Sequence, residues 1–431
     1  MSTQLEQIAA KAKADRTLRF TSLAHLLTPV FLIETWRQMN RRGASGVDGE
    51  TTTEFGRELE TRVQDICARL KAGTYRAPPV RRVEIPKGPG KVGTRPLGIP
   101  TVEDRLVQRA VARIVEAVFE ADFLDCSYGF RPTRSPHHAL RTLRATLVTK
   151  KVGHLYEADI RGYFTHINHQ WLMRMVAHRI ADGVILRLIG KWLRAGVMQD
   201  GVVVRTEAGT PQGGPLSPLL ANVYLHFVLD LWFEKKVRRG LRGEAYLVRF
   251  ADDFVASFQY KGDAESFDRY LRTRFARFNL ELADDKTRLL LFGRFATERT
   301  AEYDARPETF DFLGFTHVCG TDGHGRFAVI RLPSPKSRRK FLARTKEWLA
   351  RHRHWKRRDQ QRHLTMMLRG FYQYFGLHHC KRKLDAVRRE VALQWVRVLR
   401  RRSQRHRLYW CYLKSRTWFE LPYAETCHAT V

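Results

Sequence analysis

Residues 248–258 read VRFADDFVASF and set two adjacent carboxylates, Asp252 and Asp253, between two apolar segments. The flanking runs, YLVRF and FVASF, are rich in aromatic and β-branched residues and are short enough to be strands. The pattern predicts a β-hairpin with the acids at its tip. Paired acids in a turn are usually solvated, but these flanks place them at the end of a sheet, where they repel each other unless a cation is present.

A further acid, Asp159, ends a second apolar strand in HLYEADI, residues 154–160. If this strand and the hairpin are neighbours in one sheet, Asp159 and Asp252 can share hard divalent cations through oxygen ligands, which is the coordination that Mg²⁺ prefers. Two such ions about 4 Å apart would hold the attacking and the leaving oxygens of an in-line phosphoryl transfer. The sequence therefore predicts a magnesium-dependent phosphoryl-transfer site.

The segments around these acids predict an α+β domain with an antiparallel sheet backed by helices. Helices are expected where apolar residues share one face, and further strands are expected at RLLLF and TFDFLGF. The helical faces are Leu106, Ala110, Ile114 and Val118; Leu216, Leu220, Val223 and Phe227; and Phe267, Leu271, Phe275 and Phe278, with one more helix from His169. After Pro335 the pattern is helical, with helices near 336–354, 359–376 and 381–402.

A chain of 431 residues exceeds what one hydrophobic core usually supports. Clusters of Gly and Pro at 86–100, 209–218 and 332–335 punctuate the pattern. We expect three regions, at 1–150, 151–333 and 334–431.

Positive charge is abundant and concentrated. The chain has 77 Lys and Arg against 44 Asp and Glu, a formal charge of +33, and residues 331–410 alone hold 25 basic and 4 acidic residues. Neutralising phosphates and releasing their counterions calls for such a surface, so a nucleic acid is the expected partner. A generic basic surface is the simpler alternative.

The remaining composition favours a cytoplasmic protein that does not act at a membrane. The six cysteines form no CxxC pair, so neither a zinc site nor a disulfide framework is indicated. The N-terminal segment MSTQLEQIAAKAKADR lacks the apolar core of a signal peptide, and no apolar run reaches the roughly 18 residues that span a bilayer.

The sequence resembles the reverse transcriptases of group II introns from about residue 28 to about 420. The family's YADD box reads FADD here, with Phe250 in place of Tyr, and six more blocks occur in the family's order. They are ASGVDG (44–49), RPLGIPTVEDRLVQ (95–108), SYGFRP (127–132), GTPQGGPLSPLLANVYL (209–225), FLGF (312–315) and LRGFYQYF (368–375). The resemblance implies a right-hand polymerase fold, with fingers in the first region and a palm in the second, followed by an α-helical thumb, or maturase, domain.

The resemblance also implies roles for the acids. Asp159 and Asp252 match the carboxylates that bind two Mg²⁺ ions, for which Mn²⁺ is a substitute, and the carbonyl of Ile160 matches a further ligand. Asp253 is the adjacent acid, either at the metal site or structural. Lys286, in DDKTRLLLF, matches the lysine proposed to protonate the leaving pyrophosphate, although an isolated lysine is more often a solvated surface charge.

Nucleotide-binding positions follow from the same match. Phe164 lies where the family places an aromatic ring against the sugar's 2′ carbon, and Gln212 in TPQGGP matches a glutamine that contacts the incoming dNTP. A core phenylalanine and a turn glutamine are the simpler interpretations. Lys87 and Arg95 match fingers residues that hold the triphosphate. The loop GPGKVGT between them is long, so Lys91 is an alternative to Lys87.

The last matches concern the nucleic acid. Phe312, Leu313 and Gly314 of FLGF correspond to the primer grip, and LRGFYQYF corresponds to the thumb, which binds intron RNA and the template-primer duplex. Thr165 stands where relatives often have Asp. No Cys-paired HNH-type segment follows the thumb, so we expect a form without the DNA endonuclease. Any insertion into DNA would then use a nick or a replication fork made elsewhere.

Four functions remain open at this point. The leading hypothesis is an RNA-directed DNA polymerase that binds an RNA template, a DNA or RNA primer and dNTPs, and assists splicing of a group II intron RNA. A domesticated polymerase serving phage defence, CRISPR spacer acquisition or DNA repair is the second. An RNA-binding maturase with an inactive site is opposed by the intact acids, and an RNA-dependent RNA polymerase is opposed by Phe164. The oligomeric state is left open.

Overall fold

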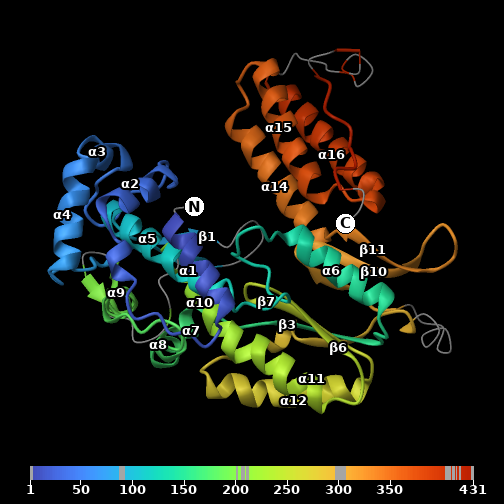
Figure 1. Ribbon diagram of the computed structural model, residues 1–431. Helices are drawn as coiled ribbons and strands as arrows, with labels where there is room; N and C mark the ends of the chain where they lie inside the picture. The colour runs from blue at the N-terminus through green and yellow to red at the C-terminus, as the bar shows by residue number, and fades with distance from the viewer. Residues whose placement is uncertain are drawn as a thin grey trace. The chain divides into compact units, whose positions relative to one another are not determined.

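The protein is described from a computed structural model (Figure 1). The described residues are 3–86, 93–199, 202–204, 209, 213–296, 307–402, 409, 413, 415–416 and 419–428. The chain divides into two compact units. Unit 1 comprises Met1–Pro86, Gly93–Ala139 and Tyr156–Leu289, and unit 2 comprises Lys87–Val92, Leu140–Leu155 and Leu290–Val431. The three-region division stays a prediction.

The N-terminal part of unit 1, as far as it is described, contains five α-helices, of which α5 is the longest. These are α1 (Thr3–Ala14), α2 (Pro29–Arg37), α3 (Thr52–Arg57), α4 (Leu59–Lys71) and α5 (Val102–Phe119). Thr28 caps α2 by accepting a hydrogen bond from the amide of Phe31, and Thr51 and Glu54 form a reciprocal capping box on α3. The predicted apolar face of α5 is confirmed, because Leu106, Ala110, Ile114 and Val118 are all fully buried.

A first sheet in unit 1 has the order β2-β1-β4-β5. Its strands are β1 (Val80–Pro86), β2 (Thr94–Ile99), β4 (Val197–Gln199) and β5 (Val202–Val204). β1 pairs with β2 in antiparallel fashion but with β4 in parallel, so the sheet is mixed.

A second sheet has the order β6-β7-β3-β8 and carries the predicted acids. We call it the acidic sheet. Its strands are β3 (His154–Asp159), β6 (Ala245–Phe250), β7 (Asp253–Phe258) and β8 (Arg288–Leu291). The predicted hairpin is confirmed, since β6 and β7 pair in antiparallel fashion from Ala245 opposite Phe258 to Phe250 opposite Asp253.

One helix precedes the first strand of this sheet in the sequence, and the others follow that strand. They are α6 (Pro136–Thr149), α7 (Tyr163–His166), α8 (His169–Ala177), α9 (Gly183–Arg194), α10 (Ser217–Leu225), α11 (Arg238–Gly240) and α12 (Lys261–Arg277). In Figure 1, α12 runs beneath the strands, and its residues Phe267, Leu271 and Phe275 are buried in the core. Between α10 and α11 the chain is partly π-helical, at His226–Asp230 and Phe233–Val237.

Unit 2 contains a sheet of β9 (Phe310–Phe312), β10 (Phe315–Thr321) and β11 (Phe327–Pro333), in the order β11-β10-β9. TFDFLGF was expected to be one strand, but it turns at Leu313 and Gly314, where φ is 49° and 80°. Two consecutive residues with positive φ favour a tight hairpin, and Gly314 supplies one of them.

Helices α14 (Pro335–Arg351), α15 (Arg357–Phe375) and α16 (Lys381–Arg400) confirm the predicted C-terminal helices (Figure 1). Ser334 caps α14 by accepting from the amide of Ser337, with Pro335 at the first helical position. None of the helices in the described part of the chain is long and apolar enough to cross a membrane.

Candidate active site

Asp159 and Asp252 lie on neighbouring elements of the acidic sheet. Asp159 is the last residue of β3, and β3 lies next to β7, which begins directly after Asp252. Asp252 itself lies in the turn of the β6–β7 hairpin, and the preceding Ala251 has φ of 58°. The sequence predicted a shared site only if the strand that ends at Asp159 and the hairpin are neighbours in one sheet. The structure meets this condition.

Lys286 lies at the same end of the sheet. Its ammonium forms an ion pair with the carboxylate of Asp159, across 127 residues of sequence. The hydrogen bond to Asp159 raises the pKa of Lys286 most, and nearby carboxylates, Asp252 among them, raise it further. Lys286 is thus within electrostatic reach of both Asp159 and Asp252.

The backbone after β3 is held in a defined way. Ile160 lies opposite Leu282 in an antiparallel bridge, and the two flanking hydrogen bonds run from the amide of Arg161 to the carbonyl of Glu281 and from the amide of Ala283 to the carbonyl of Asp159. In such a pair the central residues direct their own polar groups away from each other. The Ile160 carbonyl is therefore not used by this pairing.

Phe164 lies in α7, which follows directly on this segment. Its ring contacts Tyr163 edge to face at 5.3 Å between centroids, and it is partly buried against the core of unit 1. Gly209 also contacts this region, because its amide donates to the carbonyl of Ile167 at 2.8 Å. Phe164 is thus neither a fully enclosed core residue nor a solvated one.

The two predicted nucleotide-binding segments approach each other through glycines. Gly213 has φ of 127°, and a Cβ atom there would lie 2.3 Å from the carbonyl oxygen of Gly98 on β2. Only glycine allows the loop and the strand to come so close. Arg95 lies on β2 opposite Ile85. The side chain of Arg95, and all of Lys87, Lys91 and Gln212, lie outside the described residues.

The predicted primer-grip residues lie in unit 2, at the β9–β10 turn. Phe312 is buried, whereas the carbonyls of Leu313 and Gly314 accept hydrogen bonds from the start of α14 and from α15. Tyr374 donates to Leu313 at 2.9 Å, and the amide of Ser334 donates to Gly314 at 2.9 Å. This turn is therefore fixed to the C-terminal helices of its own unit.

Sequence reasoning missed a buried group of residues behind the hairpin, centred on Arg249 and Asp230. Both side chains are fully buried and form an ion pair at 2.5 Å. Signals were present, because an arginine interrupts the apolar strand AYLVRF and an aspartate interrupts the apolar helix HFVLD. Buried charges are rare unless paired, so each of them predicted a partner.

Comparison with known proteins identifies the family to which the chain belongs. Residues 85–317, more than half of the chain, match the family of reverse transcriptases (RNA-dependent DNA polymerases). The chain is 32% identical to Protein YkfC of Escherichia coli K12 over 365 residues, covering 80% of this chain and 95% of that protein.

The chain belongs to the reverse transcriptase family, in its group II intron type. It is 40% identical to the group II intron-encoded protein LtrA of Lactococcus lactis over 235 residues, which are 53% of this chain and 38% of LtrA. A shorter match, 32% over 97 residues, links it to nuclear intron maturase 1 of Arabidopsis thaliana. The chain thus carries an RNA-directed DNA polymerase domain, and its family implies a template, a primer and nucleotides as partners.

Reverse transcriptases use divalent metal ions, so the fit of the site to such an ion matters. Among the described residues no three His, Cys, Asp or Glu side chains gather as a metal-binding group. Mg²⁺ is commonly bound by one or two carboxylates together with substrate phosphates, and a preformed protein cage is not needed. Asp159, Asp252 and the Ile160 carbonyl supply hard oxygen donors of this kind.

Proposed function

We propose that this reverse transcriptase copies RNA into DNA at Asp159 and Asp252, and that its basic C-terminal helices are a thumb that binds structured RNA as a group II intron maturase. The observation that carries the first part is the placement of Asp159 at the end of β3 and of Asp252 in the turn that leads into the neighbouring strand β7, with Lys286 paired to Asp159.

In this proposal Asp159, Asp252 and the Ile160 carbonyl hold two Mg²⁺ ions, with Asp253 adjacent, and Mn²⁺ is a substitute. Bound Mg²⁺ would supply charge stabilisation of the transferring phosphoryl group. The two carboxylates orient the reacting groups from a rigid sheet, and rigid support is what places such groups accurately. Because the ligands are hard oxygens and two of them are charged, the site favours Mg²⁺ over softer metals.

Lys286 is proposed to donate a proton from its ammonium to the leaving pyrophosphate. The hydrogen bond to Asp159 raises the pKa of Lys286 and so stabilises the ammonium, which is the form that carries the proton to be donated. The same ion pair keeps the ammonium beside the reacting centre. Arg95 and either Lys87 or Lys91 are proposed to hold the triphosphate, and Gln212 to contact the incoming nucleotide.

Phe164 is proposed to select deoxyribose. Its partly buried ring is supported by Tyr163, which is itself fixed by a hydrogen bond from its hydroxyl to the carbonyl of Ala221 at 2.5 Å. A ring held in this way excludes a ribose 2′-hydroxyl by steric overlap. Phe312, Leu313 and Gly314 are proposed to hold the primer end.

The C-terminal region is proposed to bind intron RNA because its charge exceeds what its own acids can neutralise. Residues 331–410 hold 25 basic residues and 4 acidic ones, and much of this charge lies on exposed positions of α14, α15 and α16. Such a surface matches the phosphate backbone of a folded RNA. Splicing assistance and retrotransposition are the roles that follow from this partner, in line with the likeness to LtrA.

The test of the polymerase site is primer extension on poly(rA)/oligo(dT) with Mg²⁺. We expect Asp159→Asn and Asp252→Asn each to lower the rate roughly 1000-fold or more, because several kcal/mol of transition-state stabilisation are lost. RNA binding should change little. The matched control is Asp285→Asn, an exposed acid beside Lys286, which should remain within about threefold of wild type. Extension by either variant at the wild-type rate would exclude these acids from the site.

The test of Phe164 is single-nucleotide incorporation of dNTP against rNTP by Phe164→Val. We expect the preference for dNTP to fall about tenfold or more, because truncating the ring removes the overlap with the 2′-hydroxyl. The control is Phe278→Val, a buried ring on the same core, which should lower the melting temperature but leave the ratio unchanged. An unchanged ratio in folded, active Phe164→Val would make Phe164 an ordinary core residue.

A further inference from the structure

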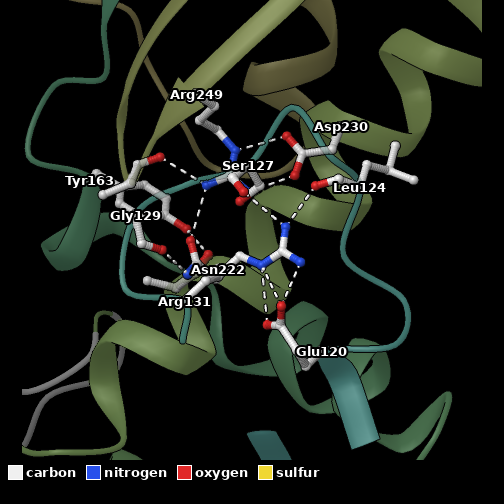
Figure 2. A network of polar contacts seen from close by, with 11 residues as sticks. Glu120, Leu124, Ser127, Gly129, Arg131, Tyr163, Asn222, Asp230 and Arg249 are labelled. Atoms are coloured by element: carbon white, nitrogen blue, oxygen red, sulfur yellow. Dashed lines mark hydrogen bonds and ion pairs between the residues drawn. The ribbon is translucent and has the colours of Figure 1, made fainter. Parts of the chain in front are cut away.

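The guanidinium of Arg249 makes hydrogen bonds to four residues that lie on three segments, all within unit 1. Its Nε and Nη2 donate to the carboxylate of Asp230 at 2.8 and 2.5 Å. Its Nη1 donates to the carbonyl of Ala251 at 2.9 Å and to Oδ1 of Asn222 at 3.1 Å, and its Nη2 donates to Ser127 Oγ at 2.7 Å. Figure 2 shows this guanidinium enclosed by its partners.

The segment 126–129 runs alongside β6 and reaches the catalytic turn. The amide of Arg249 donates to the carbonyl of Cys126 at 2.7 Å, and the amide of Tyr128 donates to the carbonyl of Arg249 at 2.9 Å. At the turn, a Cβ atom on Gly129 would lie 2.3 Å from the amide nitrogen of Ala251. Glycine is therefore required for this segment to support the turn from behind.

A second guanidinium holds the same segment from the other side (Figure 2). Arg131 donates to the carbonyls of Leu124 and Ser127 at 2.7 and 2.8 Å and pairs with Glu120 at 2.6 Å. Asn222 completes the connection, because its Nδ2 donates to the carbonyl of Gly129 at 2.6 Å. The blocks SYGFRP and LLANVYL, whose role the sequence left unexplained, thus meet at Arg249.

Two local features indicate that this arrangement serves the turn rather than stability alone. Ala251 adopts φ of 58°, which is unfavourable for a residue with a Cβ atom and persists only where its surroundings enforce it. Its carbonyl is the acceptor that Arg249 binds. Asp230 ends a π-helical turn, a rare conformation that is often found at functional sites.

We propose that Arg249 is a positioning residue of the polymerase site: it fixes the strained Ala251 and thereby the orientation of the neighbouring Asp252 carboxylate. This rests on the proposed function, in which Asp252 binds the metal ions. Groups that orient metal-binding side chains commonly affect metal affinity and activity about 10- to 100-fold. The planar, forked guanidinium is needed because one ammonium cannot reach Asp230, Asn222 and the Ala251 carbonyl together.

The experiment separates positioning from stability. The double variant Arg249→Met/Asp230→Leu removes both charges together, because a well-packed apolar replacement of a buried ion pair is often neutral for stability. The matched control is Arg179→Met/Asp122→Leu. In that pair Arg179 is buried and Asp122 is largely buried, but Arg179 otherwise donates to the carbonyls of Ala12, Asp15 and Leu18, far in sequence from the turn. For each protein, kcat, KM for dTTP, the Mg²⁺ concentration for half-maximal extension and the melting temperature are measured.

We expect the Arg249→Met/Asp230→Leu variant to lose about 10- to 100-fold in kcat and to need several-fold more Mg²⁺. The control pair should keep both values per folded molecule. Arg249→Lys, which preserves the charge opposite Asp230, covers the case in which the double variant does not fold, and it should show the same loss of kcat and the same higher Mg²⁺ requirement. Wild-type kcat and Mg²⁺ dependence in any folded Arg249 variant would overturn the positioning role.

Asp252→Asn, measured alongside, keeps this failure distinct from failure of the proposed function. If Asp252→Asn is inactive while a folded Arg249 variant is fully active, the metal site stands and only the positioning role is refuted. If Asp252→Asn is itself fully active, both are refuted.

Discussion

In the acidic sheet one arginine side chain is buried and hydrogen-bonded on every side. Along α14, α15 and α16, by contrast, arginine and lysine side chains are numerous and exposed. Arg249 is fully buried, and Asp230 together with three other acceptors uses all of its donor groups. In residues 331–410, by contrast, 4 acids can neutralise at most 4 of 25 basic residues. The same residue type therefore sets geometry in one region and supplies affinity in the other.

Desolvation explains the difference. A buried guanidinium costs several kcal/mol unless its partners are nearly ideal, so it must be fully paired in the folded protein. An exposed cation costs little and gains little from a neighbouring acid, but it gains much from a phosphate whose counterions are released. Charge removal should thus alter catalysis in the first region and binding in the second.

The largest effect expected in the C-terminal helices is on RNA affinity. Lys381, Arg382 and Lys383 are exposed at the start of α16. Replacing all three with Gln should weaken RNA binding roughly 10- to 100-fold near 0.15 M salt and reduce the slope of log K against log salt by about 2 to 3. Filter binding over a salt series measures both. The melting temperature should stay the same.

A triple variant of equal charge tests whether position matters. Lys235, Lys236 and Arg239 are exposed in the segment between α10 and β6, and their replacement with Gln removes the same three charges. We expect RNA affinity to fall less than threefold. Equal losses in the two triple variants would mean that net charge, and not the C-terminal helices, governs binding.

A smaller effect is the pH dependence of stability. We expect buried histidines to contribute to it in both units, because burial sets their pKa. Burial lowers the pKa of His226, in unit 1, to about 4 and that of His317, in unit 2, to about 3. Both ring nitrogens of His317 are buried without a partner among the described residues. The unfolded chain takes up protons near pH 6.5 and the folded chain does not, so stability is present above pH 6.5 and lost as the pH falls.

His317→Phe should therefore flatten the loss of stability between pH 6.5 and 5, by up to about 1.4 kcal/mol for each pH unit. Phenylalanine fits because His317 already stacks on Phe310, with the ring centroids 4.5 Å apart. Urea unfolding at each pH gives the free energy of unfolding of wild type and variant, and the difference between the two is compared across pH. Asp104, whose burial raises its pKa to about 6, contributes in the opposite direction, but it contributes equally to both proteins and so drops out of the difference. His354→Gln, at an exposed position, should leave the curve unchanged. A His317→Phe curve parallel to that of wild type would contradict the predicted direction of this effect.

The sequence was sufficient to predict those elements that depend on a local pattern of apolar residues. The FADD hairpin, the strand that ends at Asp159 and the C-terminal helices follow from apolar periodicity within short windows, and the structure has each of them. The β9–β10 turn was missed because FLGF reads as a continuous apolar strand until the positive φ of Leu313 and Gly314 is known.

Long-range partners were beyond such reasoning. The pairing of Lys286 with Asp159 joins residues 127 positions apart, and no pattern along the chain specifies it. Arg249 and Asp230 are each a charge in an apolar segment and were still missed, because the π-helical turn that brings Asp230 to Arg249 has no local signature. The contacts of Ser127, Gly129 and Asn222 were likewise visible only once the chain had folded.

The most direct test of the division between catalysis and binding is a single-turnover primer extension from a preformed complex at saturating template-primer. We expect the variant with Gln at 381, 382 and 383 to extend at the wild-type rate once bound, and Asp252→Asn to bind normally but not to extend. Extension by Asp252→Asn, or a tenfold slower rate in the saturated triple variant, would contradict this division.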